Sequence, residues 1–218
     1  MIRAVFFDVG ETIVDETREY GTWADWLGVP RHTFSAVFGA VIARGGDYKD
    51  AFQVFRPGFD LGEERERRAA AGDAEKFGED DLYPDAAACL TRLREQGLLV
   101  GLAGNQTARA EKILWSLNLP VDVIGTSDGW GVEKPSPMFF DQVITRAGCP
   151  AAQVLYVGDR TFVDIAPAQQ AGMATARVRR GAWGYIEADP EIEARCLFQL
   201  DTLAELPDLV RDHNNTSS

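Results

Sequence analysis

The sequence has little of what marks a secreted, membrane-spanning or nucleic-acid-binding protein. Its three cysteines are far apart and show no C-x-x-C spacing, so we expect reduced thiols in a cytoplasmic protein. Lys and Arg total 22 against 34 Asp and Glu, and the net charge of −12 disfavours nucleic acid or an anionic membrane as a partner. No apolar run approaches the roughly 18 residues needed to cross a bilayer.

Short apolar runs alternate with helical patterns along most of the 218 residues. The runs predict buried strands at 4–7, 98–103, 121–124, 154–157 and 174–178, with a last short strand near 196–200. Helices are predicted at 85–96, 107–117, 137–147, 161–171 and 202–210, and residues 213–218 are expected to fray. This alternation predicts an α/β protein with a Rossmann-like parallel sheet and helices on both faces.

The interval between the first two strands breaks that rhythm, because it is far longer than an ordinary crossover. Its apolar spacing predicts four helices, at 20–27, 31–43, 50–55 and 62–71. We therefore expect an inserted α-helical cap domain at 15–83, with 1–14 and 84–218 forming the α/β core.

Polar residues follow the predicted strands at the positions where ligands bind in open α/β sheets. Asp8 follows the first strand, Asn105 the second, and Asp159 and Asp164 the fourth, while Lys134 lies in a loop. Two carboxylates at one strand end suit a hard cation such as Mg²⁺, which takes oxygen ligands. The sequence therefore predicts a metal and anion site at this edge.

Three segments, in this order, resemble the haloacid dehalogenase (HAD) superfamily. They are Phe6–Ile13 (FFDVGETI), Lys134–Pro137 (KPSP) and Gly158–Met173. Members of that superfamily are mostly Mg²⁺-dependent phosphohydrolases that use an aspartyl nucleophile beneath a cap. The resemblance implies such an activity here, on a small phosphorylated metabolite.

The resemblance also implies a role for each matching position. Asp8 would be the nucleophile and a metal ligand, and Lys134 would neutralise charge on Asp8 and the phosphoryl group. Asp159 would ligate Mg²⁺ directly, Asp164 would hold the metal's water shell or orient Lys134, and the backbone carbonyl of Gly10 would complete the protein's ligands.

Phosphate binding is expected at the end of the second strand. The resemblance places Gly104 and the backbone N–H of Asn105 there, and Lys134 against the same group. Thr107 would either contribute its hydroxyl or cap the following helix.

Two positions depart from the family pattern. Gly10 stands where the family has a second Asp, a general acid and base whose help is worth typically 10²–10⁴-fold. Gly104 stands where the family has Ser or Thr. Glu11 would either replace the missing Asp or point elsewhere.

These departures leave two alternatives beside the hydrolase. The first is a HAD scaffold that binds Mg²⁺ and a phosphate-bearing ligand with weak or no turnover. The second is a phosphonate-type hydrolase, which would need Lys49 or Lys76 as a Schiff-base lysine. Oligomeric state and the individual substrate are not encoded in any pattern of the sequence.

Overall fold

The computed structural model describes residues 1–216 and divides the chain into two compact units. One contains Met1–Asp15 and the chain from Leu82 onward, and the other contains Glu16–Asp81. Asp15, Leu82 and Tyr83 thus belong to the first unit, whereas the sequence analysis placed them in the insertion.

The first unit is built on a six-stranded, wholly parallel sheet, which confirms the predicted fold class. Its strand order is β3-β2-β1-β4-β5-β6, and Phe7 at the end of β1 lies opposite Leu102 and Val157. Because all strands are parallel, their carboxyl ends meet at one edge. The strands are β1 Ala4–Phe7, β2 Leu99–Gly104, β3 Val123–Thr126, β4 Val154–Gly158, β5 Ala174–Val178 and β6 Phe198–Leu200.

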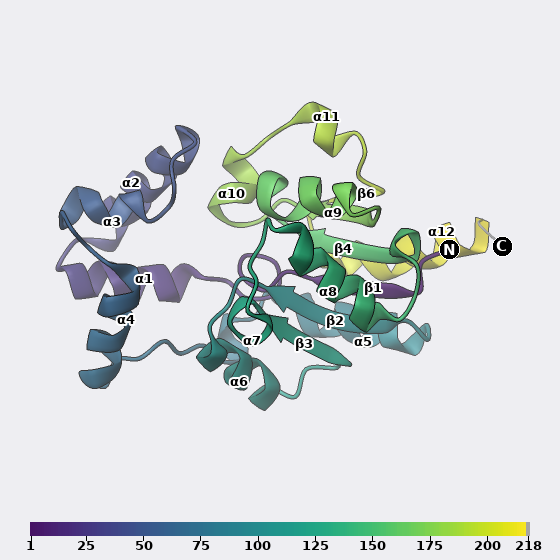
Figure 1. Ribbon diagram of the computed structural model, residues 1–218, viewed down its shortest axis with the longest axis horizontal. Coiled ribbons are helices and arrows are strands. Elements are labelled where there is room, and N and C mark those ends of the chain that lie inside the picture. Colours follow the sequence, from purple (N-terminus) through teal and green to yellow (C-terminus); the bar gives the residue numbers. More distant parts are fainter. Residues whose placement is uncertain (217–218) are drawn as a thin grey trace. The chain divides into compact units, whose positions relative to one another are not determined.

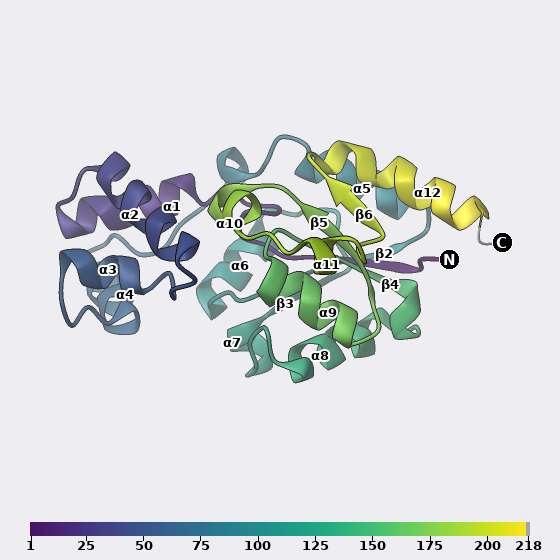
Figure 2. The same ribbon diagram turned by 90° about the horizontal axis from the view of Figure 1, so that it is seen from above.

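Helices cover both faces of this sheet (Figures 1 and 2), with α8 and α9 on one face and α5 and α12 on the other. The helices of the unit are α5 Ala86–Glu95, α6 Ala108–Ser116, α7 Ser127–Trp130, α8 Pro137–Ala147, α9 Ala166–Gln170, α10 Gly181–Ile186, α11 Pro190–Glu193 and α12 Leu206–Thr216. A π-helical turn, η3 Thr161–Ile165, precedes α9, and 3₁₀ turns lie at η2 Ala151–Gln153 and η4 Leu203–Glu205.

Several predicted boundaries need correction. The expected helix at 161–171 is a π-helical turn followed by a short α-helix. Helix α12 reaches Thr216, so the fraying expected from residue 213 is wrong up to that point, and residues 217–218 lie outside the described chain. Helix α10 was not predicted at all.

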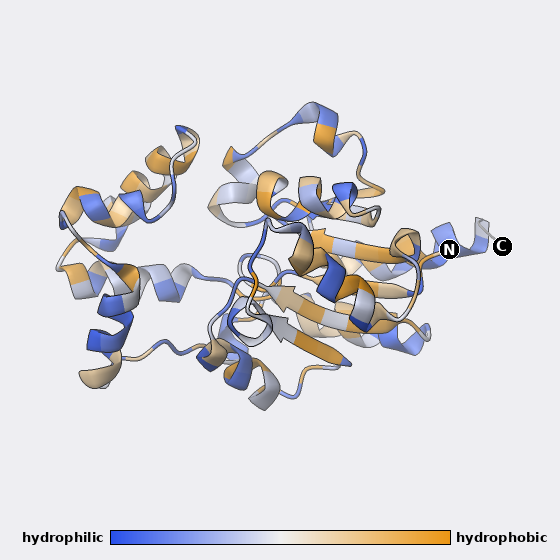
Figure 3. Cartoon of the chain, in the orientation of Figure 1, coloured by the Kyte–Doolittle hydropathy of each residue, from blue (hydrophilic) through white to orange (hydrophobic). Residues whose placement is uncertain are grey.

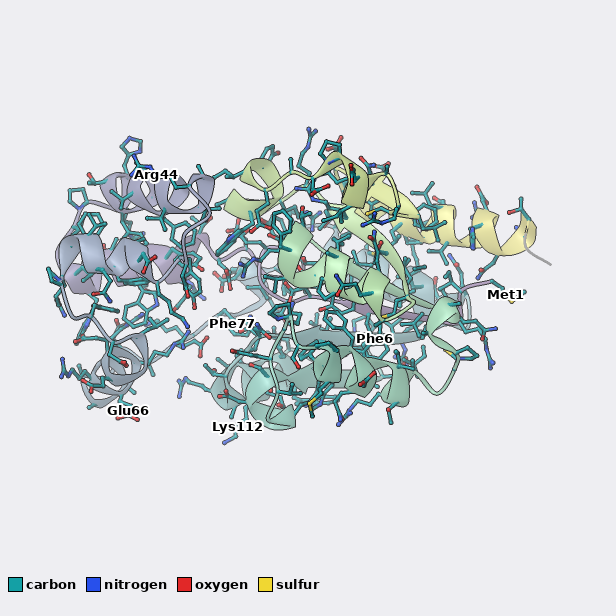
Figure 4. The ribbon with its side chains drawn as sticks, turned by 45° about the horizontal axis from the view of Figure 1, so that its top comes forward. Met1, Phe6, Arg44, Glu66, Phe77 and Lys112 are labelled. Atoms are coloured by element: carbon teal, nitrogen blue, oxygen red, sulfur yellow. The ribbon has the colours of Figure 1, made fainter. Side chains whose placement is uncertain are left out.

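Most residues of the central strands β1 and β4 are apolar, and Figure 3 colours much of the sheet orange or pale. Phe6, labelled in Figure 4, is fully buried and packs with Phe139, Phe140 and Tyr156 against α8. Each such side chain contributes about 1.5–3 kcal/mol through removal from water. This packing fixes β1 and β4, the two strands directly followed by Asp8 and Asp159.

The second unit is helical and has an aromatic core. Its elements are α1 Thr17–Leu27, α2 Arg31–Ala43, α3 Asp50–Phe55, α4 Leu61–Ala70 and the 3₁₀ turn η1 Glu79–Asp81. Trp23 and Phe34 each meet Phe52 edge-on, with ring centroids 5.6 and 5.2 Å away. Such edge-on contacts add to the burial term. Among residues 1–216, no helix is both long enough and apolar enough to cross a membrane.

Acidic and basic side chains are also buried in the helical unit. Glu64 of α4 accepts hydrogen bonds from Trp26 and Arg67, and Arg68 stacks on the Trp23 ring with 4.1 Å from Cζ to the ring centroid. Both charged residues are 3% exposed. A buried charge is tolerated when it is paired in this way.

Candidate active site

The carboxyl edge of the sheet gathers three buried carboxylates. Asp8 follows β1, Asp159 follows β4, and Asp164 lies in η3. One oxygen from each lies within 4.8 Å of the other two. Three buried acids at this spacing repel one another unless positive charge lies among them.

Lys134 supplies part of that charge. Its Nζ lies 2.6 Å from Asp8 Oδ1 and donates to Asp164 Oδ1 at 2.5 Å. Burial lowers the pKa of Lys134, but the charges of Asp164 and Asp8 outweigh it and raise the pKa well above its usual value. Lys134 therefore stays charged between the two acids.

The cluster has three carboxylates and one lysine, and burial together with the excess of negative charge raises the pKa values of two of the acids. Burial raises the pKa of Asp8 to about 6, Asp164 adds to the rise, and Lys134 opposes it. Burial, followed by Asp164, Asp8 and Glu11, raises the pKa of Asp159 well above its ordinary value. Both Asp159 side-chain oxygens are buried and accept no hydrogen bond from any residue of the described chain. A cation among these oxygens would favour the charged forms, so the donor set fits a divalent metal.

Asn105 does not face the cluster as a free amide, because its side chain holds the backbone of Lys134. Asn105 Nδ2 donates to the Lys134 carbonyl at 2.9 Å, and Lys134 N–H donates to Asn105 Oδ1 at 2.7 Å. This two-way bond fixes the loop from which Lys134 reaches Asp8. Thr107 is the N-cap of α6, where its Oγ1 accepts from Ala110 N–H at 3.0 Å.

Gly104 lies directly against Asp8. A Cβ at this position would come within 2.7 Å of Asp8 Oδ1 and 3.2 Å of Val9 Cγ2. The Asp8 carboxylate therefore occupies the space that a side chain at position 104 would need.

Glu11 adopts a backbone conformation that is unusual for its residue type. Its φ is +52°, in the left-handed region that favours glycine, and its side chain is buried. Tyr83 Oη donates to Glu11 Oε2 at 2.5 Å. A Cβ at Gly181 would come within 2.5 Å of Glu11 Cγ, so only glycine lets α10 approach this closely. Glu11 is thus held between Tyr83 and α10.

Arg180 fixes Tyr83 from the other side. Its guanidinium lies 4.2 Å from the Tyr83 ring centroid, donates to the Thr12 carbonyl at 2.9 Å and pairs with Asp85. Burial, and then the bond to Glu11, raise the pKa of Tyr83. Tyr83, Arg180 and Gly181 were not predicted as site residues, because no local motif in the sequence marks them.

Of the residues expected at the site, Asp8, Asp159, Asp164, Lys134 and Gly104 lie together, and Asn105 joins them through Lys134. Glu11 is close enough to Asp159 to affect its pKa, while its carboxylate binds Tyr83. Lys49 and Lys76, the two candidates for a phosphonate-type mechanism, are both exposed. An exposed lysine lacks the burial that activates a Schiff-base amine.

Comparison with known proteins places this geometry in context. Residues 2–172 match the model of the haloacid dehalogenase-like hydrolases. Glyceraldehyde 3-phosphate phosphatase of Methanopyrus kandleri is 34% identical over 140 residues, which cover 63% of this chain and 60% of the relative. The corresponding enzyme of Methanocaldococcus jannaschii is matched over 57% of its length, and that of Pyrococcus furiosus, 25% identical, over 95%. Ribulose-1,5-bisphosphate 5-phosphatase of Halopiger xanaduensis is 31% identical over 137 residues, 59% of this chain and 56% of the relative.

Solved structures share the fold. A HAD phosphatase from Thermococcus onnurineus superposes with a TM-score of 0.60 at 23% identity, covering 96% of this chain and 98% of that one. L-2-haloacid dehalogenase from Xanthobacter autotrophicus gives 0.68 at 22% identity, with 97% and 99% covered. Because a phosphatase and a dehalogenase both match, the fold alone does not choose between their reactions.

Proposed function

The chain belongs to the haloacid dehalogenase-like hydrolase family, and from this membership and its site we propose that it is a Mg²⁺-dependent phosphatase acting on a small phosphorylated metabolite. One observation carries the proposal. The buried carboxylates of Asp8, Asp159 and Asp164 lie together at the carboxyl edge of the sheet, and the ammonium of Lys134 pairs with Asp8 and Asp164. A dehalogenase needs a nucleophilic carboxylate and no metal, so the orphaned Asp159 favours the phosphatase.

Asp8 is the nucleophile in this proposal. One of its oxygens bonds to phosphorus while the bond from phosphorus to the leaving-group oxygen breaks, and the leaving alcohol takes up a proton. Water then attacks the aspartyl phosphate, loses a proton and releases inorganic phosphate, which restores the carboxylate. Lys134, 2.6 Å from Asp8 Oδ1, keeps a positive charge beside both steps.

Asp8, Asp159 and the Gly10 carbonyl would hold Mg²⁺ directly. When bound, the ion offsets negative charge on the phosphoryl oxygens. Asp164 already accepts from Lys134 Nζ and from Arg160 N–H, so we assign it to orienting Lys134 and the metal's water shell.

Backbone groups take over phosphate binding, because Gly104 offers no hydroxyl. The N–H of Asn105 and the positive N-terminus of α6 provide donors, and Thr107 supports them as the cap of that helix. The two hydrogen bonds between the Asn105 side chain and the Lys134 backbone also hold the Lys134 loop beside this anion site.

Glu11 is our candidate for the acid and base that Gly10 does not provide. The observations in its favour are its burial, its influence on Asp159 and the Tyr83 hydroxyl that fixes its carboxylate. The family's second Asp corresponds to position 10 here. Glu11, one residue further along, would take over its role with the help of a left-handed backbone conformation.

The relatives narrow the substrate class. Several are named for glyceraldehyde 3-phosphate and one for ribulose 1,5-bisphosphate, both small phosphorylated sugars. We propose a phosphate ester of similar size here. The helical unit, which follows β1 and Val14 in the chain, is proposed to be the cap that selects it.

A second candidate function is a scaffold that binds Mg²⁺ and a phosphate ester but turns it over slowly. Gly10 and the engagement of Glu11 by Tyr83 favour it. Turnover distinguishes the two functions.

The test is hydrolysis of p-nitrophenyl phosphate with Mg²⁺, with EDTA, and in the Asp8→Asn variant. We expect turnover that needs Mg²⁺ and is abolished by Asp8→Asn while far-UV circular dichroism is retained. Asp141→Asn, which removes an exposed carboxylate from α8, is the matched control and should behave as wild type. Activity that survives Asp8→Asn would place the nucleophile elsewhere.

A further inference from the structure

Arg160 carries a positive charge that forms no ion pair in the described chain, although it lies close enough to Glu187 to oppose the rise that burial causes in the pKa of that carboxyl. It follows Asp159 directly, its backbone N–H binds Asp164, and its guanidinium stacks on the Trp183 ring at 4.4 Å. The side chain makes no ion pair within 4.0 Å and no hydrogen bond in the described residues, and its Nε is buried without a partner.

Three neighbouring arginines do have carboxylate partners, although the Nε of Arg177 is likewise buried without a hydrogen bond. Arg177, Arg179 and Arg180, in the next strand and the segment after it, pair with Glu193, Asp201 and Asp85, respectively. A buried donor without a partner is costly to the folded protein. Arg160, which directly follows Asp159, thus differs from these three arginines in having no carboxylate partner.

The position of Arg160 links this charge to the site. Strand β4 ends at Gly158, so Arg160 starts from the same edge of the sheet as Asp159. Trp183, on which it stacks, lies on α10, the helix whose Gly181 contacts Glu11. A guanidinium held 4.4 Å from a buried indole has lost much of its rotamer freedom, so less is lost when it binds an oxyanion.

We propose that Arg160 binds a second anionic group of the substrate, a carboxylate or a second phosphate, on the side of the site formed by α10. The inference rests on the proposed function and names the substrate class more closely: a small phosphate ester that carries another oxyanion. Arginine recognises both groups through the same paired N–H donors.

Binding measurements separate this inference from hydrolysis. In the Asp8→Asn protein with Mg²⁺, calorimetry compares 3-phosphoglycerate with glycerol 3-phosphate, which has the same length but lacks the carboxylate. Fructose 1,6-bisphosphate and fructose 6-phosphate form the second pair and test for a second phosphate. We expect at least one pair to differ by about tenfold or more in favour of the ligand that carries the second anionic group, as a charge-assisted hydrogen bond implies.

Adding Arg160→Gln should reduce that ratio to about threefold or less, and Arg160→Lys should retain part of it. Arg211→Gln, which removes an exposed arginine of α12, is the control and should leave the ratio as it is. A ratio near one in both pairs, or a preference that survives Arg160→Gln, overturns the inference.

The proposed function can fail separately. A protein that shows the Arg160-dependent preference but hydrolyses neither pair refutes the phosphatase and supports Arg160. A protein that hydrolyses all four compounds without preference supports the phosphatase and refutes the role of Arg160.

Discussion

The bond between Tyr83 and Glu11 allows a quantitative prediction. Tyr83→Phe removes the hydroxyl that donates to Glu11 Oε2 at 2.5 Å and leaves a carboxylate that is 8% exposed without this donor. Hydrogen bonds to charged groups contribute about 1.5–3 kcal/mol. For a chain of this length we therefore expect the thermal midpoint to fall by about 3–12 °C.

A double-mutant cycle assigns that loss to the pair. Tyr83→Phe, Glu11→Gln and the double variant would be compared by urea unfolding, followed by circular dichroism and fluorescence so that two-state behaviour is checked. We expect a coupling free energy of about 1–3 kcal/mol. Tyr185→Phe, on the same unit and 71% exposed, is the control and should change stability by less than about 0.5 kcal/mol.

The same variants test the catalytic role. If Glu11 is the acid and base, Glu11→Gln should lower kcat by about 10²-fold or more while KM changes little. Tyr83→Phe should lower kcat less, because the carboxylate remains but is less well fixed. Coupling below about 0.5 kcal/mol together with unchanged kcat in both variants would refute the idea that the pair forms one unit.

Three further predictions concern the carboxylate cluster. Gly104→Ser should lower kcat by roughly tenfold or more, because its Cβ would lie 2.7 Å from Asp8 Oδ1; kinetics that equal or exceed wild type would show that Asp8 can move aside. Asp159→Asn should weaken Mg²⁺ binding in calorimetry, whereas unchanged affinity would remove Asp159 from the metal ligands. Lys134→Met should cost about 3–5 kcal/mol in unfolding experiments without Mg²⁺, since it leaves two buried acids unpaired; a stability equal to wild type would contradict the pairing.

The sheet could be predicted from the sequence because its signals are local. Residues 4–7 and 154–157 are continuous apolar runs, and β1 and β4 form there with every residue of those runs buried. Helix α8 begins at Pro137, where proline suits the first turn, and ends before Gly148 at φ +61°. Alternation of such elements is enough to predict a parallel sheet, and hence the edge where Asp8 and Asp159 meet.

The support around the cluster was not predictable, because it depends on contacts between distant segments. Helix α10 is short and contains two glycines, a composition that favours a loop, yet Gly181 is required for contact with Glu11. Asn105 was expected near phosphate, but its partner is a backbone 29 residues away. The same limit applies to the helical unit. Helix α4 has charges along most of its length, and nothing in that run distinguishes the buried Glu64 from its exposed neighbours.

The two connections to the helical unit run side by side within the α/β unit. Val14 and Leu82 form an antiparallel bridge, and Tyr83 N–H donates to the Ile13 carbonyl at 2.9 Å. Residues Glu16–Asp81 are therefore inserted between two segments that pair with each other, and the hydrogen bonds of that pairing lie within the α/β unit. Helices of an insertion anchored in this way can be lengthened, replaced or lost while the bridge between Val14 and Leu82 and the ends of β1 and β4 stay in place. If the insert selects the substrate, as proposed above, the substrate preference can change without any change to the carboxylate cluster.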